Sequence, residues 1–334
     1  MYKFGLVGCG NISHRHAENI NRVGKLAAVC DIVPEKADAL AAKFNSKAYY
    51  SIDDLLKNEL DIDVIVICTP NGLHAEHSIK SLYAGKHVLC EKPMCLSTSD
   101  GIKMVRTADA CEKKIFVVKQ NRYNEPVQHV KWLLQENKLG KIFSFQINCF
   151  WNRPQPYYLN SWKGTKNLDG GILYTQFSHF IDLLYWLLGD IEAVKGYTST
   201  YANRSHFEIE DSGIAILKMK SGAMGTLNYN INSYSKNLEG SFSVFGERGS
   251  VKIGGQYLNT LEWYEVEGEE RPAISQSYSP NDYGFYQGSM SNHHKVYDDL
   301  ILSMEGNGNL LEARDAIATI EIIEKIYAYS ENFI

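Results

Sequence analysis

The fold is decided by the stretch FGLVGCGNIS at residues 4–13, in which an apolar run meets two closely spaced glycines. The run is typical of a buried strand, and a helix is predicted to begin near Asn11. Gly8 permits a tight turn, and Gly10 removes the side chain where an anion must approach the N-terminus of that helix. Ser13 stands in place of a third glycine, so the stretch predicts an anion-binding turn on an incomplete GxGxxG pattern.

Around this stretch the chain alternates short β-rich apolar runs with helical segments as far as Val118. Such alternation is typical of βαβ units around a parallel sheet, so residues 1–120 are predicted to form a doubly wound Rossmann domain. The expected strands cover residues 2–8, 26–31, 48–50, 63–68, 87–90 and 115–118. The run STSD at residues 97–100 resembles a capping box and predicts a helix that begins at Ser97.

Past Asn121 the rhythm changes, and a second domain is predicted over residues 121–334. Residues 143–151 alternate between apolar and polar side chains, as a half-buried strand does. Further strand-like runs lie at 191–201, 212–219, 223–232 and 240–246. The class is therefore α/β: a Rossmann domain plus an α+β domain with a large, open, mostly antiparallel or mixed sheet. An amphipathic helix at 311–330 is a candidate to pack back on the first domain.

The bulk composition of the 334 residues excludes several classes of protein. A net charge of -5 gives no basic surface for a phosphate backbone, so nucleic acid is not an expected partner. The apolar runs fall short of the roughly 20 residues that cross a bilayer, so no membrane association and a cytoplasmic location are expected. The seven cysteines form no CxxC pair, and we expect reduced, buried thiols and no metal site.

Asp31 follows the glycine turn by about 20 residues, at the end of the second strand, where a carboxylate accepts ribose hydroxyls and repels a 2′-phosphate. This spacing predicts a dinucleotide and favours NAD over NADP. Thr69, Pro70 and Asn71 follow another strand of the same sheet and are expected to line the ribose and pyrophosphate. For His74 two interpretations stay open, packing on this loop or contact with the cofactor.

The triplet Glu91-Lys92-Pro93 ends the fifth strand. A lysine there, shielded from water and next to a cationic nicotinamide, is expected to have a lowered pKa suited to acid/base work. From the residues alone, a solvated surface lysine explains Lys92 equally well. The predicted cofactor-binding set is Gly8, Gly10, Asn11, Ile12, Asp31, Thr69, Pro70, Asn71, His74, Glu91 and Lys92.

A second segment, DGGILYTQFSHFID at residues 169–182, places His179 and Asp182 on one helical face. Asp182 at this spacing is a candidate to orient the imidazole. The alternative is a packed core histidine with a solvated aspartate.

These motifs resemble the glucose–fructose oxidoreductase, inositol dehydrogenase and MocA family over essentially the whole chain. The resemblance implies a Rossmann domain followed by a sheet domain, with Lys92 hydrogen-bonded to the reacting alcohol and His179 as the second catalytic group. Many sugar dehydrogenases of the family carry an aspartate four residues before this histidine, where the chain has Thr175 with Gln176 beside it. A proton route through Lys92 or His179 alone is therefore expected, and we favour His179 as the base.

Aromatic and cationic residues of the second domain predict the substrate site. The predicted substrate-binding set is Lys92, Arg122, Tyr157, Trp162, Lys163, Thr175, Gln176, His179 and Tyr283. The run YLNSWKG at 158–164 is similar to a segment of enzymes that oxidise carbon 3 of UDP-N-acetylglucosamine-type sugars or their uronates. This favours a nucleotide-sugar dehydrogenase. In some of those relatives NAD stays bound and is recycled by a second substrate, and whether NAD is exchanged or recycled in this protein stays open.

Three alternatives stay open: a free sugar or polyol dehydrogenase acting on inositol or glucose, an NAD-using glycosidase, and a non-catalytic NAD-binding regulator. The pair of Lys92 and His179 argues against the regulator, because a sensor needs the glycine turn but no proton-transfer groups. The family resemblance also implies a homodimer or homotetramer, formed through an exposed sheet face of the second domain.

Overall fold

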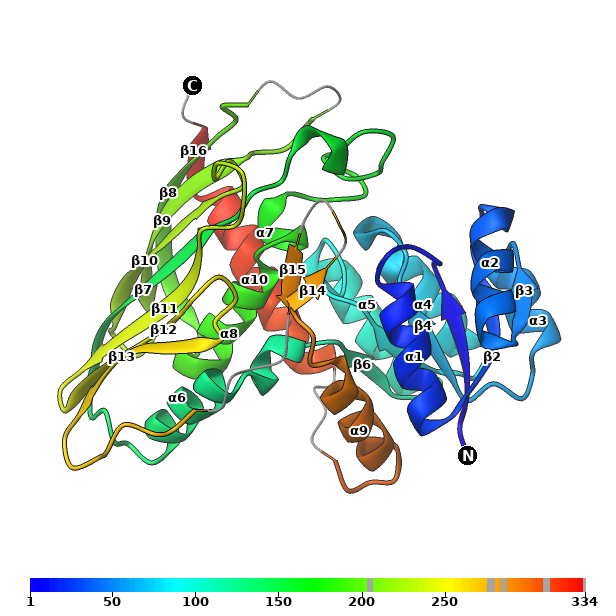
Figure 1. Ribbon diagram of the computed structural model, residues 1–334, viewed down its shortest axis with the longest axis horizontal. Coiled ribbons are helices and arrows are strands. Elements are labelled where there is room, and N and C mark those ends of the chain that lie inside the picture. Colours follow the sequence, from blue (N-terminus) through cyan, green and yellow to red (C-terminus); the bar gives the residue numbers. More distant parts are fainter. Residues whose placement is uncertain (203–206, 275–279, 283, 285–286, 309–312, 333–334) are drawn as a thin grey trace. The chain divides into compact units, whose positions relative to one another are not determined.

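The computed structural model describes residues 1–202, 207–274, 280–282, 284, 287–308 and 313–332. The chain forms two compact units, one of residues 1–119 and 293–320 and the other of residues 120–292 and 321–334 (Figure 1). The division predicted from the sequence differs from these units at 293–320, and as a division of functions it stays a proposal.

The first unit is built on a parallel sheet of six strands in the order β3-β2-β1-β4-β5-β6. Its strands are β1 (Lys3–Val7), β2 (Lys25–Cys30), β3 (Lys47–Tyr49), β4 (Val64–Ile67), β5 (His87–Cys90) and β6 (Ile115–Val117). Its helices are α1 (Ser13–Val23), α2 (Pro34–Phe44), α3 (Ile52–Asn58), the short 3-10 helix η1 (Asn71–Leu73), α4 (His74–Tyr83), α5 (Thr98–Ala110) and α9 (His293–Met304). This strand order is that of a doubly wound Rossmann sheet, as predicted.

The carboxyl ends of the central strands lie level with one another. Val7 of β1 pairs with Ile67 of β4, and Ile67 pairs with Cys90 of β5. The residues that follow these strands therefore emerge side by side at one edge of the sheet. β4 has the sequence VIVI and is fully buried, as expected for a strand covered on both faces.

Helix α9 was not predicted from the sequence, and it packs against α1 within the first unit. Its buried side chains include His293, Val296, Tyr297 and Leu300, spaced at 3, 4 and 7 residues. This spacing is typical of a helix with one buried face.

The second unit is built on a mixed sheet of eight strands in the order β13-β12-β11-β7-β10-β9-β8-β16. Its strands are β7 (Ile142–Phe150), β8 (Ile191–Ser199), β9 (Ser212–Met219), β10 (Met224–Asn230), β11 (Glu239–Gly246), β12 (Gly249–Gly254), β13 (Thr260–Val266) and β16 (Ser330–Asn332). A two-stranded sheet pairs β14 (Pro280–Asp282) with β15 (Gln287–Met290). The remaining elements are η2 (Gln120–Tyr123), α6 (Glu125–Gln135), η3 (Gln155–Tyr157), α7 (Ile172–Thr175) and α8 (Ser178–Leu188), with α10 (Ala313–Ala328) divided between the units.

The large sheet has one covered and one open face. Helices α7 and α8 lie on one side of it (Figure 1), where Phe177 contacts Trp151 and Tyr229 in an aromatic cluster. On the other side Ile214 and Ile216 of β9 are 56% and 61% exposed. The sequence predicts β7 to β11 but not β12, β13 and β16. Strand β12 begins and ends with glycine, and β16 is only three residues long. The predicted α/β class with a parallel and a mixed sheet is confirmed.

Within the described part of the chain, no helix combines the length and the apolar character needed to cross a bilayer.

The predicted start of α5 gives a test of local stability. Ser97 is the N-cap residue of α5, and its hydroxyl accepts a hydrogen bond from the Asp100 amide at 3.1 Å. We expect Ser97→Ala to lower the free energy of unfolding by about 1 kcal/mol, because a helix N–H loses its acceptor. Ser99→Ala is the matched control on the same turn, since Ser99 is exposed. Urea denaturation measures both, and equal losses would contradict the assigned cap.

Candidate active site

The site of the first unit lies where the strand order reverses, between β1 and β4. The chain runs from β1 outward to β2 and β3 on one side, and from β4 to β5 and β6 on the other. Ligands of open α/β sheets bind beyond the carboxyl ends of the strands at such a point. Gly8, Thr69 and Glu91 follow β1, β4 and β5 at this edge.

The two glycines of the turn have different tasks. Gly8 has φ +97°, and a Cβ there would lie 2.6 Å from the backbone carbon and oxygen of Cys68. Only glycine therefore lets the turn after β1 pass the loop after β4. A Cβ on Gly10 would meet no atom within 4 Å, so Gly10 borders open space before α1.

Ser13 explains the incomplete glycine pattern. Its side chain is buried, and its hydroxyl donates a hydrogen bond to the Gly10 carbonyl at 2.5 Å. The hydroxyl thus stabilises the turn, while exposed Asn11 and half-buried Ile12 stand at the start of α1. A helix N-terminus behind a glycine-lined open space fits a diphosphate, whose charge the free amides and the helix dipole favour.

Asp31 braces the same turn. Its Oδ2 accepts a hydrogen bond from the Cys9 amide at 2.7 Å, and its Oδ1 accepts one from the Val33 amide at 2.9 Å. The carboxylate is thereby held at the end of β2, level with the glycine turn. Its role toward a ribose stays a proposal.

The loop after β4 carries Thr69, Pro70 and Asn71 as predicted, with Asn71 buried in η1. His74 is 1% exposed, with Nδ1 2.6 Å from the Pro93 carbonyl oxygen and Nε2 2.8 Å from the Thr69 carbonyl oxygen. Both ring nitrogens contact the backbone, which favours packing on this loop, the first of the two interpretations, over contact with the cofactor.

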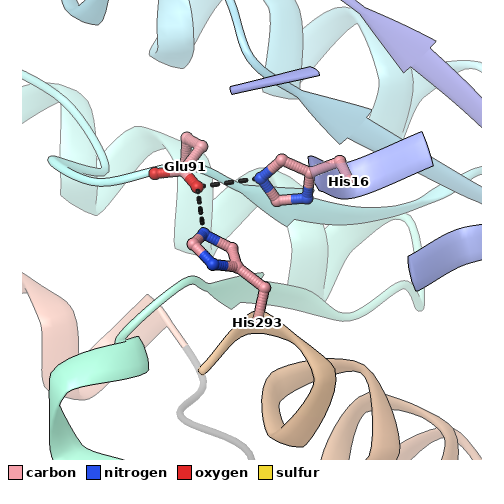
Figure 2. A group of neighbouring side chains, drawn as sticks. All are labelled: His16, Glu91 and His293. Atoms are coloured by element: carbon pink, nitrogen blue, oxygen red, sulfur yellow. Dashed lines mark hydrogen bonds and ion pairs between the residues drawn. The ribbon is translucent and has the colours of Figure 1, made fainter. Parts of the chain in front are cut away.

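Glu91, which the sequence placed among the cofactor ligands, is buried, and its carboxylate is bound by His16 within the first unit (Figure 2). Its contact with the cofactor stays a prediction. Lys92, the next residue, is half-buried at the edge of the sheet. The sequence does not distinguish His16 from other histidines, and it indicates His293 only as part of the aromatic and polar tract 281–294, a candidate substrate segment.

In the second unit, His179 lies in the first turn of α8 and is buried. Its Nε2 is 3.4 Å from Gln120 Nε2 and 3.4 Å from Ser289 Oγ. Asp182 shares its face, as predicted, and both its carboxylate oxygens are bound by Arg122, at 2.8 Å from Nε and 2.7 Å from Nη2. Arg122 thus forms a bidentate ion pair with α8, and its predicted contact with the substrate stays a prediction.

A second cluster gathers several of the predicted substrate residues. Gln176 Nε2 donates to the Tyr157 hydroxyl at 3.3 Å, and Lys163 Nζ lies 3.9 Å from the centre of the Tyr157 ring. Trp162 is half-buried, with the same ammonium 5.9 Å from its ring centre. Burial lowers the pKa of Lys163 to about 8, against the opposing charge of Asp169. Tyr283 lies outside the described residues.

Two carboxyl groups, those of buried Asp169 and half-buried Glu210, hold the segment before α8. Asp169 accepts hydrogen bonds from the Gly164 amide at 2.7 Å and from the Thr175 hydroxyl. Glu210 accepts them from the Ile172 amide at 3.0 Å and from the Tyr327 hydroxyl at 2.5 Å. Burial raises the pKa of Asp169 to about 6 and that of Glu210 to about 8. The role of Glu210 was not foreseen, since it lies 38 residues from its amide partner.

These carboxyl groups predict a pH dependence of stability. Glu210 keeps its proton in the folded state up to about pH 8, whereas the unfolded chain loses it near the ordinary value of 4.5. The folded state binds more protons in that window, so stability falls as pH rises from 4.5 to 8, by up to about 1.4 kcal/mol per pH unit for one group.

We expect Glu210→Gln to flatten this slope, because the amide carbonyl accepts the same two hydrogen bonds without a charge. Urea denaturation at pH 5 to 8 measures it. Glu208→Gln is the control, since Glu208 is exposed two residues away. An unchanged slope in Glu210→Gln would contradict the burial of a protonated carboxyl.

Comparisons with known proteins agree with this geometry. Residues 2–119 match an oxidoreductase family with an NAD-binding Rossmann fold, and residues 127–252 match the GFO/IDH/MocA C-terminal domain. The WlbA dehydrogenase from Bordetella pertussis, solved with NADH and UDP-GlcNAcA, is 35% identical, with a TM-score of 0.88 over 98% of this chain and 96% of that chain.

Two curated enzymes are also similar to the chain. The 2,7-anhydro-N-acetylneuraminate hydratase of Escherichia coli (strain K12) is 30% identical over 76% of this chain and 68% of its own length. The dTDP-3,4-didehydro-2,6-dideoxy-alpha-D-glucose 3-reductase of Saccharopolyspora spinosa is 27% identical over 81% of this chain and 80% of its own length.

A Rossmann sheet with an open glycine turn at its switch point defines the first unit as a dinucleotide-binding domain of an oxidoreductase. The chain belongs to the GFO/IDH/MocA family of oxidoreductases, and its cofactor is NAD. The family resemblance and the enzyme class inferred from the motifs are thereby confirmed. When bound, NAD would accept a hydride from a carbon that carries a hydroxyl group.

The two glycines provide a matched test of the cofactor cradle, the name we give to the open space at Gly10 in front of α1. We expect Gly10→Ala to fold normally but to weaken NAD binding by about 10-fold or more, about 1.4 kcal/mol, because the new methyl group occupies the open space. Gly8→Ala is expected to cost about 1–3 kcal/mol of stability, since the methyl group meets the Cys68 backbone at a positive φ. Calorimetric titration with NAD and thermal unfolding measure the two effects, and normal NAD affinity in Gly10→Ala would contradict the cradle.

Proposed function

We propose that this protein oxidises a secondary hydroxyl of a nucleotide sugar with NAD, and that the reacting position is carbon 3 of a UDP-N-acetylglucosamine-type sugar or its uronate. The observation that carries the proposal is the similarity to the WlbA dehydrogenase solved with NADH and UDP-GlcNAcA, which extends over 98% of the chain at 35% identity. The curated 3-reductase of a dTDP-sugar supports a nucleotide sugar and chemistry at carbon 3.

The residues of the chain suit this chemistry. Lys92 and His179 would bind the reacting hydroxyl, and one of them would take its proton, with His179 as the favoured base. His179 Nε2 lies 3.4 Å from Gln120 Nε2 and from Ser289 Oγ, which is longer than a typical hydrogen bond, and an alcohol bound at this nitrogen would form a shorter one. Thr175 occupies the place of an aspartate in many family members, and its hydroxyl is committed to Asp169. No third carboxylate is therefore assigned to the proton route.

A uronate or diphosphate also needs cations. The Lys163 ammonium lies over the Tyr157 ring, and burial lowers its pKa to about 8 because the ammonium loses hydration. The charge of an anionic ligand would compensate for that loss. We therefore assign Lys163 to the anionic part of the substrate. Tyr157 and Gln176 are hydrogen-bonded to each other, and we assign both to the same part of the proposed site as Lys163.

A substrate panel tests the proposal. We expect NAD reduction with UDP-N-acetylglucosamine or its uronate, and none with glucose or myo-inositol. Lys92→Met and His179→Asn are each expected to lower kcat by about 10²- to 10⁴-fold, because a proton-transfer group is lost. Absorbance at the NADH band in steady-state and single-turnover assays measures both. Turnover of inositol in place of the nucleotide sugar would establish the polyol dehydrogenase.

Lys163 provides a sharper arm of this test. Lys163→Met is expected to raise KM for the uronate by about 10-fold or more, with a smaller effect on the neutral sugar, because a charge-assisted contact is lost. Lys166→Met is the control, since Lys166 is exposed on the same segment. Equal effects of Lys163→Met on both sugars would argue against a carboxylate contact.

The similarity to a hydratase favours one second candidate, in which transient oxidation of a sugar leads to elimination and no net NADH accumulates. Mass analysis of the product separates it from a dehydrogenase. Tight NAD binding with no change in any sugar would favour a regulator. The homo-oligomer expected from the family stays a prediction, with the exposed face of β9 as its proposed surface.

A further inference from the structure

Lys92 lies between two residues that are anchored to buried histidines of the first unit. On one side, His16 Nε2 is 2.8 Å from Glu91 Oε1, and His293 Nε2 is 3.5 Å from the same oxygen (Figure 2). On the other side, His74 Nδ1 is 2.6 Å from the Pro93 carbonyl oxygen. All three histidines are at most 1% exposed.

The Glu91 carboxylate also binds the Lys92 backbone directly. Its Oε2 accepts a hydrogen bond from the Lys92 amide at 3.0 Å, so its two oxygens face opposite partners. Burial by itself raises the pKa of Glu91, but hydrogen bonds from His16 and His293 outweigh it and hold the pKa well below the ordinary value. An ionised carboxylate buried one residue before the proposed catalytic lysine is thus stabilised by dedicated donors.

A contact with Tyr297 orients His16. Its Nδ1 lies 2.8 Å from the hydroxyl of Tyr297, which is fully buried in α9. With Nε2 donating to Glu91, Nδ1 accepts the proton of Tyr297, so donation from Tyr297 through His16 and donation from the Lys92 amide converge on the Glu91 carboxylate. Tyr297 and His293 both come from α9, about 200 residues after Lys92. The return of the chain to the first unit therefore completes the surroundings of the lysine loop.

His16 connects this loop to the cofactor cradle. It lies in α1, the helix that begins behind Gly10, and so the same helix faces the proposed diphosphate site and holds Glu91. Catalysis by a lysine depends on its placement, and a misplacement of about 1 Å costs on the order of 10²-fold in rate. A loop with three separate anchors resists such displacement.

Two histidines and a carboxylate are also a donor set for a divalent cation, since their atoms lie within 4.8 Å of one another. The contact of 2.8 Å between His16 and Glu91 is, however, that of a direct hydrogen bond. A cation must separate these atoms, and the Lys92 amide already occupies the second carboxylate oxygen.

We propose that His16, His293 and His74 are positioning residues for Lys92, the first two acting through the Glu91 carboxylate and the third through the Pro93 carbonyl. The inference rests on the proposed function in that it assigns a task to Lys92 as the group that contacts the reacting alcohol. It predicts that a change at position 293, far along the chain, alters the reactivity of residue 92.

The test compares His293→Leu, His293→Gln and Glu91→Gln in the full-length, NAD-loaded protein. His293 is chosen because its 3.5 Å contact is the longest of the set, so its loss is least expected to prevent folding. The first readout is the rate of trace acetylation of Lys92 against pH, followed by mass spectrometry, which needs no substrate. The second is kcat and KM for the sugar that the wild-type protein oxidises.

We expect His293→Leu and Glu91→Gln to change the acetylation rate of Lys92 by about 3-fold or more and to lower kcat by about 10- to 100-fold. For His293→Leu, KM and the Kd for NAD are expected to stay within about 2-fold, because His293 is assigned to no ligand. His293→Gln keeps a side-chain N–H donor, and we expect it to restore most of the wild-type rate.

His87→Leu is the matched control. His87 begins β5, the strand that Glu91 follows, and its Nδ1 accepts a hydrogen bond from the Lys114 amide at 3.0 Å. Its loss is expected to lower stability without altering the acetylation of Lys92. The proposal is overturned if His293→Leu and Glu91→Gln lower only the melting temperature, or if His87→Leu changes Lys92 as much as they do.

Elemental analysis of the purified protein decides the other use of the cluster. One equivalent of a divalent metal, lost in His293→Leu, would overturn the positioning role in favour of metal ligation. If the wild-type protein oxidises no sugar, the proposed function fails, and the acetylation of Lys92 alone still decides this inference.

Discussion

The close approach of Gly8 to the backbone of Cys68 is the constraint on which the first unit depends. A side chain at this position would stand 2.6 Å from main-chain atoms, so only glycine lets the turn after β1 pass the loop after β4. Because β1, β4 and β5 end level with one another, this passage sets the spacing among the glycine turn, Thr69 and Glu91. Helix α1, and with it His16, takes its position from the same turn.

The second unit places its chemistry by a different means. Burial of Asp169 and Glu210 leaves two carboxyl groups whose hydrogen bonds hold the backbone around α7, just before His179. The ion pair of Arg122 with Asp182 then ties η2 to α8. The charge of Arg122, which the sequence assigned to a ligand, thus helps to hold α8, the helix that carries His179. The cost of burying this ion pair is offset by its paired hydrogen bonds.

Much of the first unit follows from local pattern. The predicted strands agree with β1 to β6 within one or two residues, since a parallel sheet buried on both faces produces short apolar runs that stand out. The cap at Ser97 and the helix that carries His179 were also predicted. His74, Glu91 and Arg122 were assigned to ligands from the sequence, and only the tertiary structure shows which protein groups bind their side chains.

By itself the sequence determined the order of strands and helices in residues 1–119, the open glycine turn and the family, because each depends on residues close together in the chain. Only the tertiary structure decided which polar side chains are engaged within the protein. His293 and Tyr297 reach Glu91 and His16 from about 200 residues or more away, and Glu210 reaches Ile172 from 38 residues away. Such contacts are absent from any local pattern, because hydrogen bonds between distant residues form only when the packed core brings their elements together.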